Sequence, residues 1–238
     1  MESTSEKLIK LAAEYNNLKY FTTDPIIFPR YFSEKLIQGE SSLQDVEIAG
    51  ILSAHLAWGK RELIVRDCNR MFDEMKWQPY SYIMAGDFKS DSVSLHRSIK
   101  WSDFAKICEN LRQFYLNNES LECFSPSYIR LNIYGCRDNP NAANKKIHMF
   151  RRWMVRNDGI VDLGLWRKIS PADLIIPLDT HVHRSSINLG ITKRNVSDYK
   201  TAVEITEYLR KVFPDDPCLG DFSLFAFTAT IGKKNGYF

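Results

Sequence analysis

The residue of this sequence best suited to chemistry is an aspartate that directly follows an apolar run. Residues 175–178 read Ile-Ile-Pro-Leu, and Asp179 follows them directly. Aspartate is a preferred N-cap residue, because its side-chain oxygen accepts hydrogen bonds from the free N–H groups of the first helical turn. The sequence therefore predicts a helix over residues 180–189 that stops at Gly190. It also predicts that the Asp179 carboxylate is rigid, ionised and able to stabilise a developing positive charge.

Positive charge collects between residues 145 and 168, where lysine and arginine outnumber aspartate and glutamate. On a predicted helix over residues 144–156, spacings of three and four residues form one stripe of basic side chains. The stripe consists of Lys145, His148, Arg152 and Arg156. A basic stripe with two tryptophans nearby can bind a phosphate backbone, and a solvated helix face gives the same pattern. The sequence leaves both interpretations open.

Two motifs resemble those of the helix-hairpin-helix DNA glycosylases, the endonuclease III-like superfamily of base-excision repair. Residues 178–184, Leu-Asp-Thr-His-Val-His-Arg, are similar to the Val-Asp-Thr-His-x-x-Arg element whose aspartate is the catalytic carboxylate of that superfamily. Residues 47–55, Glu-Ile-Ala-Gly-Ile-Leu-Ser-Ala-His, are similar to an early helix that ends in Leu-Ser-Ala-Gln. The last residue of that helix probes the DNA where the target base has been extruded. His55 occupies its place here.

A closer resemblance covers most of the chain. Residues 145–156, 162–166 and 177–182 together resemble an uncharacterised bacterial family that is distantly similar to the archaeal 8-oxoguanine DNA glycosylases. This resemblance implies a lysine nucleophile, for which Lys145 is the first candidate and Lys146 the second. A buried amine near other cations has a lowered pKa and can attack C1′ of the sugar, while Asp179 stabilises the oxocarbenium character that develops. The Schiff base that follows permits strand scission.

The resemblance further implies a partner and a set of contacts. The partner is duplex DNA with a damaged base, such as an oxidised purine, which is flipped out of the stack. The candidate DNA contacts are His55, Lys60, Arg61, Lys146, Arg151, Arg152, Arg156, His181 and Arg184. Trp153 and Trp166 are the candidates for stacking on the base. We expect no cofactor and no metal. Since only Cys218 follows Asp179, we also expect no four-cysteine iron–sulfur cluster of the kind found in the superfamily.

Two other functions remain open. One is a metal-dependent hydrolase that uses Asp179, His181 and His183, although on a helix the first and third side chains share a face while His181 points away. The other is a non-catalytic nucleic-acid-binding protein that has the glycosylase fold. It stays open because residues 135–140 replace the glycine-rich hairpin whose N–H groups contact DNA phosphates in the superfamily, and because a fold alone does not confer chemistry.

Helices must position these residues, because polar and apolar residues almost nowhere alternate over a stretch as long as a β-strand. Apolar spacing and capping residues predict helices over residues 6–20, 45–58, 60–75, 102–114, 144–156, 180–189, 197–212 and 222–231. Residues 22–30, 77–100 and 120–141 carry proline, glycine or serine and are predicted to be largely irregular. The predicted fold is an all-α, two-lobed domain of the DNA glycosylase type with a cleft between the lobes. The lobes are interleaved, with residues 40–140 in one and residues 1–39 and 141–238 in the other.

Composition limits the class of protein. The 238 residues are 44% hydrophobic and 13% aromatic, which is typical of a folded globular protein. The formal charge of +3 does not by itself indicate a polyanionic partner. Five scattered cysteines without a C-x-x-C pair argue against a disulfide framework and against a thiolate metal site. The polar N-terminus and the lack of a long apolar window predict a soluble, cytoplasmic protein without a membrane span.

Overall fold

The computed structural model describes residues 2–234, with side chains as far as residue 227. The described part is mostly helical and contains one short antiparallel hairpin, in agreement with the predicted all-α fold. No helix in this part is both long and apolar enough to cross a membrane. The chain divides into two compact units, which we call the terminal unit (residues 1–20 and 139–238) and the internal unit (residues 21–138).

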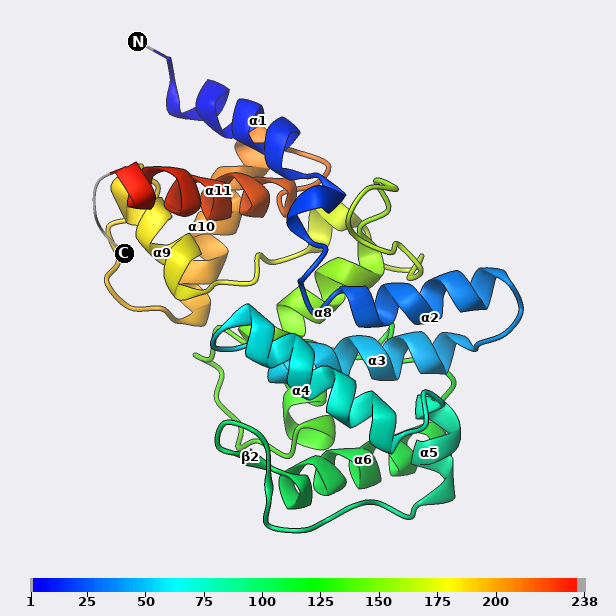
Figure 1. The fold of residues 1–238 in the computed structure, drawn as a ribbon. Helices are drawn as coiled ribbons and strands as arrows, with labels where there is room; N and C mark the ends of the chain where they lie inside the picture. The colour runs from blue at the N-terminus through cyan, green and yellow to red at the C-terminus, as the bar shows by residue number, and fades with distance from the viewer. Residues whose placement is uncertain (1, 235–238) are drawn as a thin grey trace. The chain divides into compact units, whose positions relative to one another are not determined.

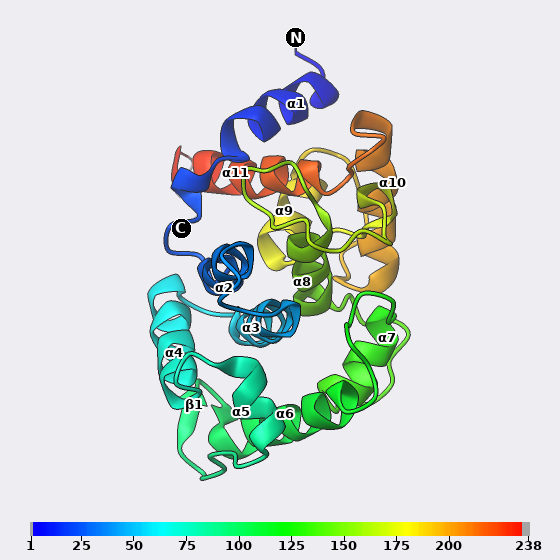
Figure 2. The same cartoon turned by 90° about the vertical axis from the view of Figure 1, so that its right-hand side faces the viewer.

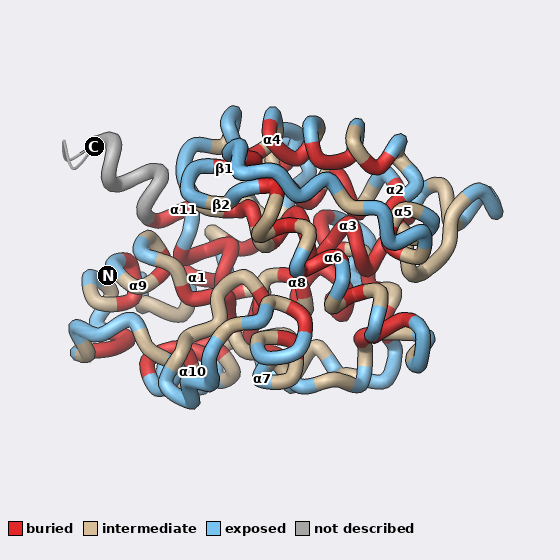
Figure 3. The backbone as a smooth tube through the Cα atoms, turned by 90° about the horizontal axis from the view of Figure 1, so that it is seen from below, coloured by how far each residue is buried: buried red, intermediate tan, exposed pale blue. Residues whose placement is uncertain are grey.

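The internal unit is built around one buried helix. Helix α3 begins at a capping box in which Ser42 Oγ accepts from the Asp45 N–H (3.1 Å) and the Asp45 carboxylate accepts from the Ser42 N–H (2.9 Å). Figure 3 shows α3 as a largely buried tube. The elements of this unit are α2 (Ile27–Ile37), α3 (Leu43–Leu56), α4 (Arg61–Glu74), α5 (Pro79–Ala85), β1 (Ser94–His96), β2 (Ile99–Lys100), α6 (Trp101–Tyr115), α7 (Pro126–Tyr128) and the π-helix η2 (Ile129–Ile133).

The prediction that residues 22–30 are irregular is wrong for the second half of that segment. Helix α2 starts at Ile27 and contains Pro29 in its first turn. Proline is tolerated there because the first N–H groups of a helix have no intrahelical partner to lose. Residues 21–39 also belong with residues 40–138, whereas the sequence placed them with the termini, because α2 packs against α3.

The terminal unit brings both ends of the sequence together. Helix α11 lies between α1 and α9, so that the first and last helices of the chain are neighbours (Figures 1 and 2). The Ser223 hydroxyl donates to the Leu8 carbonyl (2.7 Å), which fixes α11 against α1. The elements of this unit are α1 (Thr4–Tyr15), the 3-10 helix η1 (Leu18–Tyr20), α8 (Lys145–Val155), the 3-10 helix η3 (Pro171–Asp173), α9 (Thr180–Asn188), α10 (Tyr199–Val212) and α11 (Leu219–Lys234).

A buried carboxylate on α3 ties three segments of the internal unit together. Glu47 is fully buried and accepts hydrogen bonds from the Tyr115 hydroxyl (2.9 Å) and the Ser120 hydroxyl (2.5 Å). It also accepts from the Leu121 N–H (3.0 Å). Burial first, and the Glu47 charge second, raise the pKa of Tyr115 well above its ordinary value, so that this hydroxyl keeps its proton and donates. Glu47, which lies in the motif of residues 47–55, therefore has a structural role in the fold.

We expect Glu47→Ala to lower the free energy of unfolding by about 3 kcal/mol, since three donors lose their buried acceptor at about 1 kcal/mol each. Urea denaturation measures this loss. Glu119→Ala removes an exposed carboxylate of the same unit and should change stability by less than about 0.5 kcal/mol. If the two variants were equally stable, the Tyr115 and Ser120 hydroxyls would have found other acceptors.

Candidate active site

Lys145 and Asp179 face each other in the terminal unit. The Lys145 Nζ atom lies 3.8 Å from Asp179 Oδ2, which is ion-pair distance but too long for a hydrogen bond. The side chains remain 32% and 23% exposed, so that both can be reached from solvent. The two groups that the sequence singled out as nucleophile and stabiliser are therefore adjacent, on the first turn of α8 and at the head of α9.

The local sequence fixes the position of Asp179. Its Oδ1 atom accepts a hydrogen bond from the Val182 N–H (2.9 Å), which confirms the predicted N-cap. The preceding segment is extended and buries Leu178, and the Ile176 N–H donates to the Thr206 hydroxyl of α10 (3.2 Å). One carboxylate oxygen thus holds the helix while Oδ2 is left to face Lys145.

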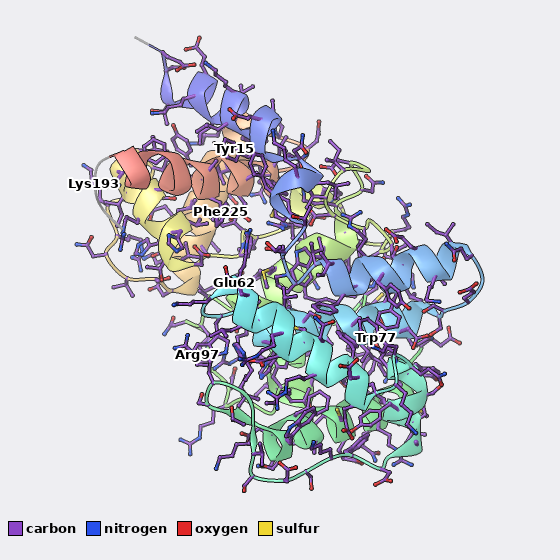
Figure 4. All side chains as sticks on the ribbon, viewed as in Figure 1. Tyr15, Glu62, Trp77, Arg97, Lys193 and Phe225 are labelled. Carbon is purple, nitrogen blue, oxygen red and sulfur yellow. The ribbon has the colours of Figure 1, made fainter. Side chains whose placement is uncertain are left out.

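Helix α11 contributes two side chains to this region that the sequence analysis missed. The Ser185 hydroxyl of α9 donates to the Leu224 carbonyl of α11 (2.7 Å), which holds the two helices together. Phe225, labelled in Figure 4, is 36% exposed, and its ring centroid lies 6.5 Å from that of His181. Asp221 lies one turn earlier on α11. In the sequence, the only feature that could have pointed to these two side chains is an acidic residue directly before the predicted apolar helix.

Asp221 is a buried carboxyl group near Asp179. It is 6% exposed, and one of its oxygens lies 2.6 Å from Arg152 Nη1. Burial raises the pKa of Asp221 to about 6; Arg152 opposes this shift, and the Asp179 charge adds to it. Asp221 can therefore change its protonation close to neutral pH.

The prediction that Arg152 contacts DNA phosphate is wrong. This arginine is 6% exposed, and besides Asp221 its Nε atom lies 3.3 Å from Asp162 Oδ1. Its guanidinium carbon also lies 4.8 Å from the centre of the Phe222 ring. All of these groups lie outside α8. The helix pattern could not show the acidic partners, so a buried arginine was mistaken for an exposed one.

Arg156 is also misassigned as a phosphate contact. It is 1% exposed, and its guanidinium bonds to Asp162, to Asp216 (2.9 Å) and to Asp158 (2.9 Å). His148, the remaining member of the stripe after Lys145, is 3% exposed. Burial, with a smaller effect of the Arg151 charge, lowers the pKa of His148 to about 4 and keeps it neutral at pH 7. The basic stripe is therefore mostly interior, and only its first residue faces the site.

Asp162 bridges both buried arginines and is itself buried, and we expect Asp162→Ala to destabilise the protein strongly. Removing one partner of a buried pair leaves uncompensated charge and costs about 3–5 kcal/mol. Thermal and urea unfolding would measure the loss. The control is Asp158→Ala, which removes a partly exposed partner of Arg156 and should cost about 1 kcal/mol or less. If both variants lost the same amount of stability, Asp162 would contribute no more to the network than the partly exposed Asp158.

The two tryptophans proposed to stack on a base are core residues. Trp153 is 0% and Trp166 1% exposed, and Trp166 packs edge-on against Phe150 with ring centroids 5.1 Å apart. The backbone N–H of Trp166 also donates to the Met154 carbonyl (2.8 Å), which fixes the chain at this position. Neither ring can be reached by a ligand, and the stacking prediction is wrong. Phe225, whose ring lies against His181, is an exposed aromatic side chain on α11.

The other predicted contacts fall into two groups. In the terminal unit, Lys146 and Arg151 are half-buried on α8, while on α9 His181 is half-buried and Arg184 is exposed. The remaining three belong to the internal unit and are His55, Lys60 and Arg61. The His55 ring lies against Tyr134, with ring centroids 4.6 Å apart. Lys60 is exposed at the start of α4, and Arg61 forms an ion pair with Asp24 (3.3 Å). All of these side chains stay candidates for anion contacts.

The alternative metal site finds no support in the geometry. His183 Nε2 lies 2.8 Å from the Arg194 carbonyl oxygen, and the His181 ring lies against Phe225. Among the residues that the structure describes, no three His, Cys, Asp or Glu side chains are grouped so that they could hold a metal ion.

The sequence profile of a family described as "Protein of unknown function (DUF2400)" matches residues 24–131 and 129–230. No curated protein and no solved structure matches the chain. The matched segments take in most of both units and include Lys145, Asp179 and Asp221. The chain therefore belongs to the DUF2400 family of proteins of unknown function.

Proposed function

We propose that this protein is a DNA glycosylase with lyase activity that acts on a damaged base flipped out of a duplex. The observation that carries the proposal is the 3.8 Å approach of Lys145 Nζ to Asp179 Oδ2, with both side chains open to solvent. An amine beside a carboxylate is the pair that the resemblance to the helix-hairpin-helix glycosylases requires. With that resemblance, the proposal includes a two-lobed fold whose cleft receives the base.

The chemistry follows from the two groups. The amine of Lys145 attacks C1′ of the nucleotide, and the bond from C1′ to the base nitrogen breaks, with its electron pair leaving on the base. The attacking nitrogen loses one proton and the departing base takes up one, so that the step balances. Positive charge develops on the sugar during this step. We assign to the Asp179 carboxylate the stabilisation of that charge, and its N-cap bond supports this role because a fixed group avoids the cost of reorganisation during the reaction. Ring opening of the sugar then gives a Schiff base on Lys145.

The surroundings of the pair suit a nucleotide. Phe225 offers an exposed aromatic face, and base–aromatic stacking contributes about 1–3 kcal/mol per base. Lys146, Arg151 and Arg184 supply positive charge for phosphate contacts. Arg152 and Arg156 are excluded from this role by their burial. The proposal thus assigns the phosphate contacts to fewer basic side chains than the sequence suggested.

Borohydride trapping tests the proposal. The full chain is incubated with duplexes that carry 8-oxoguanine, uracil or an abasic site, and sodium borohydride is added to reduce any Schiff base. We expect a covalent protein–DNA adduct on at least one duplex, with the modified peptide mapped to Lys145. Binding of these duplexes without any adduct would favour the non-catalytic nucleic-acid-binding protein. Absence of both binding and adduct would overturn the proposal.

A further inference from the structure

The internal unit contains a cavity of about 380 Å³ between α2 and α4. It is lined by Ile27, Phe28, Tyr31, Asn69 and Trp77. Tyr31 is 39% exposed and Trp77 is half-buried, so that both rings can be reached from solvent. Pockets for small molecules have volumes in this range and are mostly apolar, with a few polar groups that fix the orientation of the ligand. The cavity therefore has the size and the lining of a small-molecule site.

Trp77, labelled in Figure 4, is held in a fixed orientation at the wall of this cavity. Lys76 and Trp77 both have a left-handed backbone conformation, with φ of 51° and 54°, which residues other than glycine rarely adopt. The backbone N–H of Trp77 donates to the Phe72 carbonyl (2.9 Å), and Nε1 of its ring donates to the Asp73 carboxylate (2.9 Å). The Tyr31 ring meets the Trp77 ring at 72°, with centroids 5.1 Å apart. Because Trp77 is already ordered, a ligand that packs on it loses little affinity to the ordering of side chains.

The cavity presents no unbalanced charge to a ligand. All five lining side chains are uncharged. Lys35 Nζ lies 5.5 Å from the centre of the Tyr31 ring, but it pairs with Glu40 at 2.8 Å. The Asp73 carboxylate next to Trp77 accepts the hydrogen bond from the indole. Since an unpaired charge is costly to bury in such a lining, the group that fits here is neutral.

Asn69 supplies a hydrogen-bond acceptor to the cavity. Its Nδ2 atom donates to the Val65 carbonyl one turn earlier on α4 (3.0 Å). Within the described part of the chain, no group donates to the Asn69 Oδ1 atom. This oxygen can accept a hydrogen bond from an N–H group of a ligand. A flat, neutral ring with an amino group therefore matches both the aromatic wall and the polar side chain.

We propose that this cavity binds a purine base that carries an amino group, such as the base of adenosine. The ring stacks on the aromatic wall of Tyr31 and Trp77, and the amino group donates to Asn69 Oδ1. Aromatic side chains stack on bases in many proteins, and asparagine recognises the amino group of adenine. A purine is favoured over a pyrimidine because the larger ring buries more aromatic surface. The site includes neither Lys145 nor Asp179, so the inference goes beyond the proposed function.

Titration calorimetry of the full chain with adenosine tests the proposal. We expect binding to one site with a Kd on the order of 0.1 mM, which is typical of a ligand of this size. Purine riboside has the same ring without the amino group and should bind about tenfold more weakly, because Asn69 loses its hydrogen bond. A short oligoadenylate forms a second arm. If it binds more tightly than adenosine, the natural source of the base is an unpaired nucleic-acid strand, and if it binds equally, the source is a free nucleoside.

Asn69→Leu should bind adenosine and purine riboside equally, because the variant has no acceptor for the amino group. Asn132→Leu is the matched control, since Asn132 Nδ2 also donates to the carbonyl four residues earlier, that of Tyr128 (3.1 Å), but the residue does not line the cavity. It should keep the preference for adenosine. Tyr31→Ala removes an exposed ring and should weaken the binding of both ligands by at least about fivefold.

Absence of saturable adenosine binding by the folded chain would overturn the proposal. Equal binding of adenosine and purine riboside by the unmodified protein would overturn it as well, and so would adenosine binding that is unchanged in Tyr31→Ala. None of these titrations depends on a Schiff base at Lys145. Their outcome is therefore distinct from that of borohydride trapping with damaged DNA.

Discussion

Replacing Lys145 by glutamine is expected to reduce the borohydride-trapped adduct with damaged DNA to background. Glutamine keeps most of the length of the side chain but has no amine to form a Schiff base. The measurement is the yield of adduct on denaturing gels, with binding of the same duplex measured alongside. Binding should weaken only slightly, because the variant loses one cation among several.

Lys146→Gln is the matched control, since this lysine is the next residue of α8 and is also half-buried. We expect it to keep most of the adduct. The reverse result, with the adduct lost in Lys146→Gln and kept in Lys145→Gln, would make Lys146 the nucleophile. An adduct that forms in both variants would show that neither lysine is the nucleophile.

Asp179→Asn is expected to lower the rate of base release by a factor on the order of 10³, which is typical when a charge that stabilises the transition state is removed. Asparagine is as good an N-cap as aspartate, so the bond to the Val182 N–H and the start of α9 should persist. DNA affinity should therefore stay within about a factor of three, which is less than 1 kcal/mol. Single-turnover assays and binding titrations separate the two quantities.

Asp198→Asn gives a close control for that substitution. Asp198 caps α10 as Asp179 caps α9, with its Oδ1 accepting from the Thr201 N–H at 2.8 Å. Its ion-pair partner is Arg194, at 2.7 Å, and not a lysine of α8. We expect turnover to be unchanged in this variant. A parallel loss of turnover and DNA affinity in Asp179→Asn alone would instead indicate that Asp179 serves binding, and would remove it from the chemistry.

The buried arginines show why charge counting along a sequence can mislead. The basic segment of residues 145–168 looked like a surface for phosphate, yet its arginines at positions 152 and 156 are neutralised inside the terminal unit. Two tryptophans next to them are buried as well. Of the basic stripe, only Lys145 remains partly exposed, and it faces Asp179.

The sequence by itself determined the features that depend on near neighbours. The cap of α9 is one of these, because the hydrogen bond from the Val182 N–H to Asp179 spans three residues. The approximate positions of α3, α4, α8 and α10 are others, since apolar spacing and turn residues report helices directly. The start of helix α2 was missed because a proline in the first turn looks the same in a sequence as a proline in a loop.

Only the tertiary structure decided which charged side chains are inside. The contact from Arg152 to Asp221 joins residues 69 positions apart, and that from Arg156 to Asp216 joins residues 60 positions apart. A helical pattern of three and four residues carries no information on such partners, so it could not distinguish an exposed stripe from a buried network. The same holds for the approach of Lys145 to Asp179 within one unit, which the order of the motifs alone could only suggest.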